Sequence, residues 1–502
     1  RRTAQRDVAE PVDAMSAALE PSGLVPPIAG LAMPVQSLRE APPVRRAAPT
    51  VRTRGARLVA FGGALVLTSI ATWQMARAVS IGSTSALQWA LVGLFTLTFG
   101  WIAWSATAAI AGALFPSRRR DVTQPPLPRT ALVMPVYNEA PASTTAALLA
   151  MGEGLHALGH GEQFEIFVVS DTNVPEVWVQ ETAAIDLLRR RLHGRVRVWY
   201  RRRPRNTGRK AGNVKDFVER WGARYDAMLL LDADSVLAPE TLVLMSRRMA
   251  ADPRLGILQS IPMLAGGRGL LARMQQFASR VYGPIVGRGI AAWQGEDGNY
   301  WGHNAIIRTR AFAECCGLPT LPGRQPFGGA ILSHDFVEAA LIRRGGWSVR
   351  MDPDLDGSWE DSPPTLLDIA TRDRRWAQGN LQHAAVLGAR GLAWPNRAHF
   401  VNGIAGYLVS PLWCALIVVG LALAVIAHTT DPVYFKEPFQ LFPDWPRFDA
   451  VLMVWLFVAA MGVLVLPKVL GVARALRDEA LRRSCGGGAR IVASAFAELL
   501  VS

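Results

Sequence analysis

Cysteine is scarce in this chain of 502 residues, which contains only Cys315, Cys316, Cys414 and Cys485. Their spacing matches no zinc-binding pattern and implies no framework of disulfide bonds. The apolar residues near the start of the chain are too interrupted for a secretory signal peptide. Neither a structural zinc site nor a small disulfide-stabilised scaffold is therefore expected.

Acidic residues are outnumbered, with 40 Asp and Glu against 54 Lys and Arg, which gives a formal net charge of +14. Such a balance is typical of proteins that bind nucleic acid, an anionic membrane face or anionic small substrates. Charged residues make up only 19% of the chain and hydrophobic residues 50%. This composition favours the lipid bilayer and a phosphate-bearing substrate, and we expect no nucleic acid.

Four long apolar segments occur, at residues 58–79, 87–115, 400–427 and 451–470. Each is long enough to cross a bilayer, which takes about 20 residues. Basic residues lie outside each pair of segments, and by the positive-inside rule they belong in the cytoplasm: Arg52, Arg54, Arg57, Arg118, Arg119 and Arg120 around the first pair, and Arg474, Arg477, Arg482, Arg483 and Arg490 after the second. The link between the third and fourth segments, which contains Tyr434, Phe435, Phe439, Phe442 and Trp445, carries few positive charges and therefore suits the outer face.

The length allows two or three domains, and we predict four regions. They are a disordered cytoplasmic arm (1–56), a transmembrane hairpin (57–116), a cytoplasmic domain (117–398), and transmembrane helices with a basic loop near 471–490 (399–502). A fifth span is predicted to begin near Ile491. The chain starts with Arg1 and stops inside an apolar stretch, so we expect a fragment of a longer protein.

In the cytoplasmic domain, short apolar runs alternate with helical patterns, which predicts an α/β fold with a mostly parallel sheet. The predicted strands are 130–136, 164–170, 196–200 and 227–231, and the predicted helices are 143–158, 177–192 and 210–221. Residues 270–285 have apolar positions at helical spacing, which predicts one helix that faces the core or lies on a membrane surface.

The apolar run Met228–Leu231 ends in two carboxylates, Asp232 and Asp234. Carboxylates buried on a strand without partners are costly, but at the carboxyl end of a strand they can reach a ligand. Two such oxygens suit a hard divalent cation that also holds a diphosphate. The pattern also fits haloacid-dehalogenase-like phosphatases, in which the first Asp is a nucleophile. That motif ends the first strand of its domain, whereas other strands precede this one, so we rank the phosphatase lower.

Other polar residues also follow predicted strands or precede predicted helices. Asp171 could accept hydrogen bonds from a base or ribose, or simply cap a turn. Arg209 and Lys210 lie between glycines at the start of a helix, where they could hold a diphosphate or line a solvated loop. Asp335 could cap a helix or act as a general base. Arg375 and Trp376 could clamp phosphate and stack on a sugar, or face lipid headgroups.

Taken in order, these elements resemble the processive, membrane-integrated family 2 glycosyltransferases, the group that contains cellulose and hyaluronan synthases. Those enzymes carry a strand-end Asp, Asp-x-Asp, a Thr-Glu-Asp-like triplet and Gln-x-x-Arg-Trp, and the matching positions here are Asp171, Asp232/Asp234, Asp335 and Arg375-Trp376. Two departures, Ser333-His334 in the triplet and Arg372 for Gln, look like the glucan biosynthesis glucosyltransferase H subgroup. The resemblance covers roughly residues 55–500.

The resemblance implies a GT-A-like glycosyltransferase domain between transmembrane helices of a bacterial inner membrane. It implies UDP-glucose as donor, Mg²⁺ or Mn²⁺ as cofactor, and a growing β-linked glucan, largely β-1,2, exported to the periplasm. Asp335 would be the catalytic base, Asp171 would hold the uridine, and Asp232 and Asp234 would hold the metal and diphosphate. An acyl carrier protein and a periplasmic glucan-processing partner are implied by resemblance alone.

Three other functions are compatible with the sequence. They are single-sugar transfer to polyprenyl phosphate, synthesis of another β-glycan such as cellulose, and a transporter or sensor with a degenerate nucleotide domain.

Overall fold

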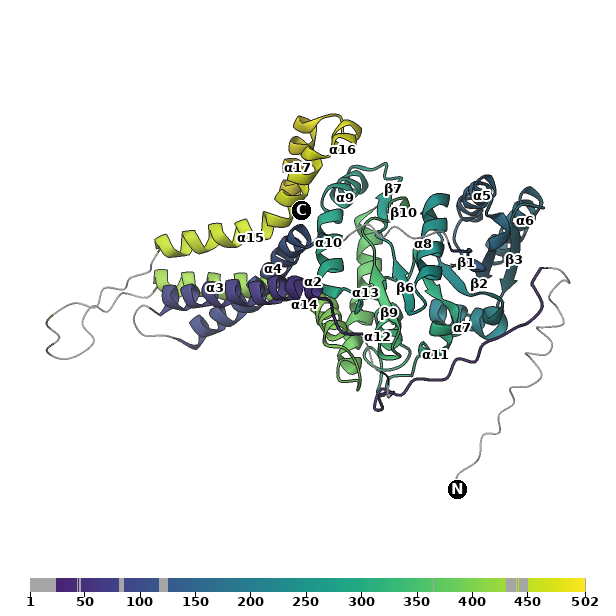
Figure 1. The fold of residues 1–502 in the computed structure, drawn as a ribbon. Coiled ribbons are helices and arrows are strands. Elements are labelled where there is room, and N and C mark those ends of the chain that lie inside the picture. Colours follow the sequence, from purple (N-terminus) through teal and green to yellow (C-terminus); the bar gives the residue numbers. More distant parts are fainter. Residues whose placement is uncertain are drawn as a thin grey trace, which may run out of the picture.

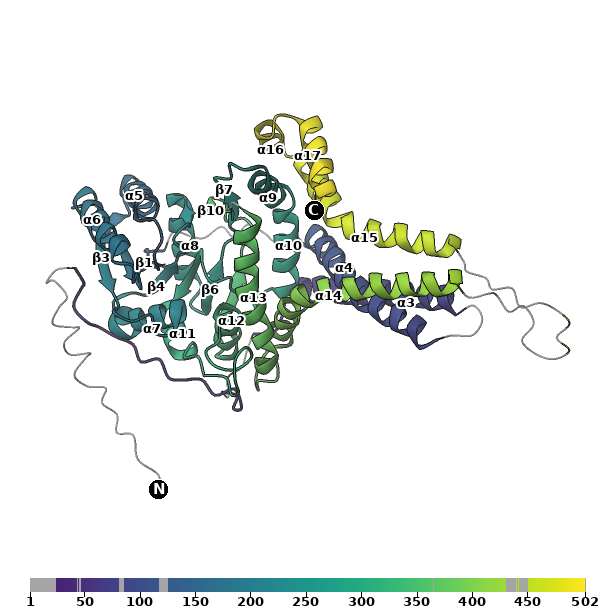
Figure 2. The same cartoon turned by 180° about the vertical axis from the view of Figure 1, so that it is seen from behind.

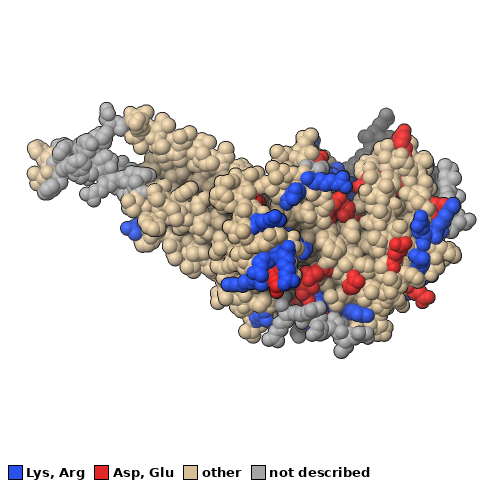
Figure 3. All heavy atoms as spheres, turned by 90° about the horizontal axis from the view of Figure 1, so that it is seen from above, with Lys and Arg blue, Asp and Glu red and all other residues tan. Residues whose placement is uncertain are grey.

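The computed structural model describes residues 24–501, except 43, 45–46, 81–84, 117–124, 364, 430–438, 440 and 442–449. An α/β domain lies at one end, and long helices project from it together on one side (Figures 1 and 2). Lys, Arg, Asp and Glu are spread over the visible face of the α/β domain, whereas the projecting helices show few of them (Figure 3). The two parts therefore differ in surface chemistry as the sequence predicts.

The main sheet has seven strands in the order β3-β2-β1-β4-β8-β6-β9. Their bounds are β1 (Thr130–Val136), β2 (Phe164–Ser170), β3 (Arg197–Arg202), β4 (Ala227–Leu230), β6 (Leu255–Gln259), β8 (Ala305–Arg308) and β9 (Ser348–Met351). Thr130 pairs with Phe164 on one side and with Ala227 on the other, both in parallel register, while β8 runs antiparallel to β4 and β6. The predicted α/β fold with a mostly parallel sheet is confirmed.

Helices cover both faces of this sheet (Figure 1). One face packs against α5 (Pro141–Ala157), α6 (Pro175–Arg191) and α8 (Pro239–Ala251), and the other against α7 (Arg209–Trp221), α11 (Thr309–Cys315) and α12 (His334–Arg344). Alternate strand residues point to opposite faces, so Leu132 joins the first cluster and Val133 the second. Burial on both faces explains why the strands read as continuous apolar runs.

A second sheet has three short strands in the order β5-β10-β7. They are β5 (Val236–Leu237), β10 (Ser358–Asp361) and β7 (Met263–Ala265). β10 runs antiparallel to β5 and parallel to β7. Because β5 begins two residues after Asp234, this sheet is joined directly to the paired carboxylates.

Four helices in the described part of the chain are long and apolar enough to cross a membrane: residues 51–79, 86–114, 394–429 and 451–477. The first comprises α2 (Val51–Arg57), a π-helical turn (Leu58–Gly62) and α3 (Gly63–Val79); the others are α4 (Ala86–Leu114), α14 (Trp394–Thr429) and α15 (Ala450–Arg477). They match the four predicted spans, except that the second helix ends one residue before the predicted end at Phe115. The predicted basic flank at residues 118–120 and the outer-face residues Tyr434, Phe435, Phe442 and Trp445 lie outside the described residues.

The helix predicted over residues 270–285 forms two helices, α9 (Leu270–Val281) and α10 (Gly283–Gln294). Pro284 lies in the first turn of α10, where its missing N–H costs least, and this explains the break. The described residues form three further α-helices: α13 (Leu366–Val386), α16 (Glu479–Ser484) and α17 (Gly488–Val501). α9 packs against α15 and α17 through Phe277, Val281 and Ile491.

The N-terminal segment differs from the predicted disordered arm, because residues 24–42 lie extended against the α/β domain. The amide of Tyr200 donates to the carbonyl of Leu24 (2.9 Å), and the amide of Leu31 donates to the carbonyl of Val218 (3.1 Å). Met33 is buried in the cluster beside α7. A segment without periodicity is ordered here by tertiary packing and edge pairing, which a periodicity test does not detect. Residues 1–23 lie outside the described residues.

Buried charge joins the first membrane helix to the helix that carries Asp335. Arg57 of α2 places Nη2 2.7 Å from Oδ2 of Asp297, and Arg343 of α12 pairs with the other oxygen of the same carboxylate. Breaking a buried pair of this kind costs about 3–5 kcal/mol. The orientation of α12 is therefore fixed relative to the apolar helices.

Candidate active site

The carboxyl ends of β1, β2 and β4 meet at one edge of the main sheet, because these strands are parallel. The hydrogen bonds between strands continue one residue past β2 and one residue past β4. Asp171 N donates to Val136 O (2.9 Å), and Leu231 N donates to Val133 O (3.0 Å). Asp232 follows Leu231, and its N–H donates to Ser235 Oγ (2.9 Å). This turn projects the Asp232 and Asp234 side chains beyond the sheet.

The carboxylate of Asp232 lies between two basic side chains. The ammonium group of Lys210 contacts Oδ1 and also donates to the carbonyl of Gly302 (2.9 Å). Nε2 of His303 lies 4.0 Å from Oδ2. Burial raises the pKa of Asp232, but attraction to Lys210 and His303 outweighs burial and lowers the pKa below its usual value. Asp232 therefore carries its charge at neutral pH.

Other carboxyl groups around this turn have shifts in the opposite direction. Solvent reaches Asp234, yet partial desolvation and repulsion by Asp232 raise its pKa. Burial, together with repulsion by Asp232, also raises the pKa of Glu139 and that of Glu360, despite the attraction of His303 for Glu360. The turn thus holds more negative charge than Lys210 and His303 offset, and a bound cation would relieve it.

This donor set suits Mg²⁺ or Mn²⁺ held together with a phosphate group. Within the described part of the chain, no group of three or more His, Cys, Asp or Glu side chains is arranged to hold a metal ion. A closed site made only of protein ligands is therefore not formed here. Mg²⁺ commonly takes one or two carboxylates, with water and substrate phosphates as its other ligands. Asp232 and Asp234 fit that kind of site.

Asp335 lies in the first turn of α12, close to the same turn. Its Oδ2 lies 3.4 Å from the position that a Cβ on Gly302 would occupy, so Gly302 lies between Asp335 and Lys210. Gly302 has φ +88°, which favours glycine and permits this close approach. Burial raises the pKa of Asp335; attraction to His334 does not offset burial and repulsion by Glu338. The fold therefore gathers Lys210, Asp232 and Asp335 from three distant parts of the sequence.

Asp171 lies in a different environment. It is 4% exposed, and Arg203 forms two charge-assisted hydrogen bonds to it, Nε to Oδ1 and Nη2 to Oδ2, each 2.7 Å. Arg203 lies one residue past β3, the strand beside β2. The sequence shows Arg203 only within a run of arginines and does not indicate that it pairs with Asp171.

The side chains of the other predicted binding residues lie apart from these contacts. Arg209 is exposed at the start of α7 with φ +54°, and its carbonyl accepts a hydrogen bond from Arg203 (3.3 Å). Arg375 and Trp376 are exposed on α13, and Cζ of Arg372 lies 4.5 Å from the centre of the Trp376 ring. In the described residues no ion pair joins Arg375 to the carboxylates of Asp232, Asp234 or Asp335. Arg372 is thus a cation–π partner that the sequence prediction missed.

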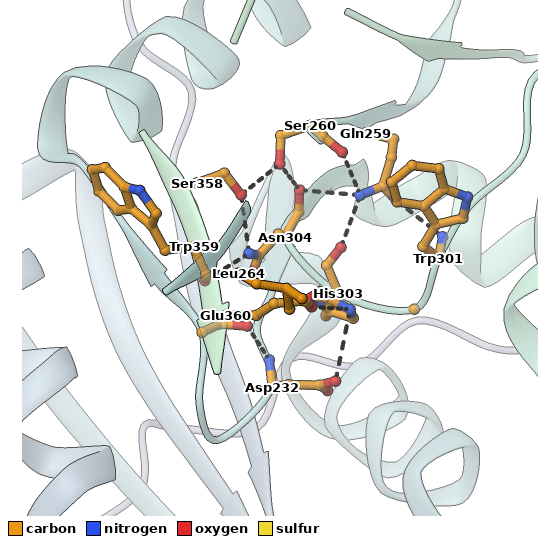
Figure 4. A network of polar contacts seen from close by, with 12 residues as sticks. Asp232, Gln259, Ser260, Leu264, Trp301, His303, Asn304, Ser358, Trp359 and Glu360 are labelled. Carbon is orange, nitrogen blue, oxygen red and sulfur yellow. Dashed lines mark hydrogen bonds and ion pairs between the residues drawn. The ribbon is translucent and has the colours of Figure 1, made fainter. Parts of the chain in front are cut away.

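Two further residues of the site were missed, His303 and Glu360. Nε2 of His303 lies 3.2 Å from Oε2 of Glu360, so the imidazole lies between Glu360 and Asp232 (Figure 4). The sequence signal for His303 was its place in Gly302-His303-Asn304 after two aromatic residues. Glu360 had no signal, because a four-residue strand far along the chain shows no recognisable pattern.

Comparison with known proteins identifies the domain that carries this site. The family model described as Glycosyl transferase family 2 matches residues 131–316, and that described as Glycosyl transferase family group 2 matches residues 227–466. A mannosyltransferase from Pyrobaculum calidifontis, solved in complex with GDP-Man and Mn²⁺, covers 82% of this chain and 99% of its own at 17% identity, with a TM-score of 0.48.

Curated relatives named Glucans biosynthesis glucosyltransferase H match most of the chain. The protein from Vibrio cholerae is 48% identical over 449 residues, which are 89% of this chain and 62% of the relative. The protein from Shewanella putrefaciens is 48% identical over 480 residues, which are 94% of this chain and 66% of the relative. The chain thus spans somewhat less than two thirds of the length of these relatives. Since the two family matches together cover residues 131–466, the chain belongs to family 2 of the glycosyltransferases.

Proposed function

We propose that this protein is a membrane-embedded, inverting glucosyltransferase that polymerises glucose from UDP-glucose into a β-linked glucan with largely β-1,2 linkages. The observation that carries the proposal is the under-neutralised carboxylate turn at Asp232–Ser235, which lies beside Lys210 and Asp335 in a family 2 domain. The four membrane-length helices support a product that leaves through the bilayer.

The donor would bind at the edge of the sheet where β1, β2 and β4 end. Asp232 and Asp234 would hold Mg²⁺ or Mn²⁺, with Asp234 the more direct ligand because Lys210 and His303 already engage Asp232. When bound, the ion would offset charge on the departing diphosphate. The Lys210 ammonium would approach the same diphosphate, with Arg209 as a second phosphate contact. Asp171, held by Arg203, would bind the uridine.

Asp335 would act as the general base. The acceptor hydroxyl would give its proton to the Asp335 carboxylate, and its oxygen would attack the anomeric carbon from the face opposite UDP. The bond from that carbon to the diphosphate oxygen would break, and UDP would leave with the electron pair, so the configuration would invert. Burial raises the pKa of Asp335 and so makes its carboxylate a stronger base, which suits this role.

Trp376 would stack on the acceptor end of the growing glucan, and Arg375 would complement the charge of the diphosphate. Both lie on α13, which packs against the apolar helix α14. An acceptor held there would be close to the route into the membrane. The enzyme would lie in a bacterial inner membrane with its α/β domain in the cytoplasm and export glucan to the periplasm. An acyl carrier protein and a periplasmic glucan-processing partner are proposed from the family resemblance alone.

Incubation of membranes that contain the protein with labelled UDP-glucose, followed by linkage analysis of the product, tests the proposal. We expect metal-dependent release of UDP and a polymer with β-1,2 linkages. A single labelled sugar on polyprenyl phosphate would replace the proposal with single-sugar transfer, and β-1,4 linkages would indicate a cellulose-like synthase. No UDP release by folded protein would favour a transporter or sensor.

A further inference from the structure

His303 joins two carboxylates that come from distant parts of the chain. Its Nε2 lies 3.2 Å from Oε2 of Glu360 on β10 and 4.0 Å from Oδ2 of Asp232 after β4 (Figure 4). The imidazole is largely enclosed, with a side-chain exposure of 15%. Nδ1 is buried and has no hydrogen-bond partner among the described residues. The contacts that orient the ring are therefore made through Nε2, and the shorter one is to Glu360.

The backbone around His303 is anchored to buried polar groups. The side chain of Gln259 is fully buried; it accepts from Trp301 N (3.0 Å) and donates to His303 O (3.0 Å). Asn304 has φ +49°, and its Nδ2 donates to Ser358 Oγ (3.0 Å) and to Trp359 O (3.2 Å). These bonds fix the loop that carries His303 against β10, the strand that carries Glu360.

β10 is in turn fixed to the residues that follow the paired aspartates. Ser358 pairs with Leu237 and Trp359 with Val236 in antiparallel register. The small sheet thus sets the distance between Glu360 and the Asp232–Ser235 turn. Asp232 is held on one oxygen by Lys210 and faces His303 with the other. No hydrogen bond from the described residues 232–235 orients the Asp232 oxygen that faces His303.

From this geometry we propose that Glu360 is a positioning residue: it orients His303, and His303 in turn holds the Asp232 carboxylate in the orientation that binds the donor diphosphate. The inference rests on the proposed function, because it concerns the donor side of that site. Asp335 lies on α12 and takes no part in the contacts of His303 described above. His303 and Glu360 should therefore act on donor binding and not on the chemical step. Loss of Glu360 or His303 should therefore weaken donor binding more than turnover at saturation.

The test uses the full chain in detergent and the variants H303A, E360A, the double variant and the conservative H303Q and E360Q. UDP affinity with Mn²⁺ is measured by calorimetry, and KM and kcat for UDP-glucose are measured separately. We expect H303A and E360A each to weaken UDP binding about tenfold and to raise KM, with kcat within about twofold. H303Q and E360Q should recover much of the loss. D186A removes an exposed carboxylate of α6 and should behave like the wild type.

The double variant decides whether Glu360 acts through His303. We expect it to bind UDP no more weakly than H303A alone, because E360A has nothing left to orient. Additive losses, or an unchanged UDP affinity in a folded H303A protein, would overturn the proposal. If the wild type binds no UDP, the proposed function and the donor role fail together. Thermal unfolding of the same variants without ligand then still shows whether positions 303 and 360 are coupled, and additive changes would disprove that contact.

Discussion

Asp171 and Asp234 come from the same sequence signal, an apolar strand that ends in a carboxylate, but their surroundings differ. Asp171 is 4% exposed and has two hydrogen bonds from Arg203. Asp234 reaches solvent, lies beside the charged Asp232 and has a raised pKa. The difference arises because an arginine follows the strand next to β2, whereas Lys210 reaches Asp232, and among the described residues no ion pair is formed by Asp234.

Charge at this edge of the sheet is balanced around Asp171, whereas around Asp234 it needs a ligand. The Asp171–Arg203 pair satisfies its own charges and can contribute to stability in the absence of substrate. The turn at Asp234 is electrostatically incomplete, as expected of a site that a cation and a diphosphate would fill. Substitutions on the two sides should therefore have opposite effects on folding and on binding.

The largest effect is expected from D335N. Asp335 lies on the side of the site that needs a ligand, which also holds Asp232 and Asp234 and is called the open side below. Removing a general base lowers kcat about 10²- to 10⁴-fold. UDP binding in the presence of Mn²⁺ should stay close to that of the wild type, because Asp335 is not among the proposed donor ligands. Labelled-polymer synthesis and calorimetry measure the two quantities on the same preparation. Retained synthesis would rule out the base role, and lost UDP binding would move Asp335 to the donor site.

The Asp171–Arg203 pair, called the closed side below, should affect the stability of the folded protein. R203A leaves a buried carboxylate without its partner, and such a change costs about 3–5 kcal/mol. We expect a clear fall in the temperature of thermal unfolding, followed by tryptophan fluorescence in detergent, with D234A as the matched variant on the open side. A fall for D234A as large as that for R203A would show that the two sides do not differ as described.

Metal binding should stabilise the open side alone. A saturating cation at 100 times its Kd stabilises the folded state by about 2.7 kcal/mol. D234N should lose this Mn²⁺-dependent rise in unfolding temperature, and its metal-free form should unfold at or above the wild-type temperature because a repelling charge is gone. D171N keeps the Asp232–Asp234 pair and should still respond to Mn²⁺. An undiminished response in D234N would contradict the proposed ligand.

The effect of Mn²⁺ on stability should shrink as the pH falls from neutral toward the usual carboxyl pKa of about 4. Asp234 and Glu360 have raised pKa values, so they take up protons before ordinary carboxyl groups do. A protonated carboxyl group has lost the negative charge that attracts a cation, so Mn²⁺ binds more weakly. In metal-free protein these two groups stabilise the fold as pH falls through their raised pKa values toward the usual value near 4. Asp232 has a lowered pKa, and its contribution is lost only at pH values below the usual one. Unfolding temperatures with and without Mn²⁺ across this range measure both effects.

The sequence predicted the elements that have a clear physical pattern. β1 and β2 have the predicted bounds, because parallel strands buried on both faces give uninterrupted apolar runs. The four membrane-length helices were found for a similar reason, since their apolar length is a local property. Asp232 and Asp335 could be proposed as site residues from the sequence because each lies at the end of a strand or the start of a helix.

The contacts that depend on tertiary arrangement were not predictable. Arg203 reaches Asp171 only because β3 pairs with β2, and Glu360 reaches His303 only because the short β10 pairs with β5. The extended segment at 24–42 has no periodicity and is held by pairing and packing. The sequence therefore identifies charged groups more readily than their partners.

The smallest effect is expected at the acceptor side, on α13. Cζ of Arg372 lies 4.5 Å from the Trp376 ring centre, and Trp376 remains half exposed, so the indole is braced and still accessible. A cation–π contact at such a site contributes about 0.5–1 kcal/mol. R372Q, which places the residue usual in the wider family, should therefore raise the KM for an oligosaccharide acceptor about two- to fivefold and leave UDP affinity unchanged.

W376A should have the larger effect, because it removes the stacking surface itself. If R372Q instead weakens UDP binding while the acceptor KM is constant, Arg372 acts in donor binding, and α13 contributes to both the donor side and the acceptor side.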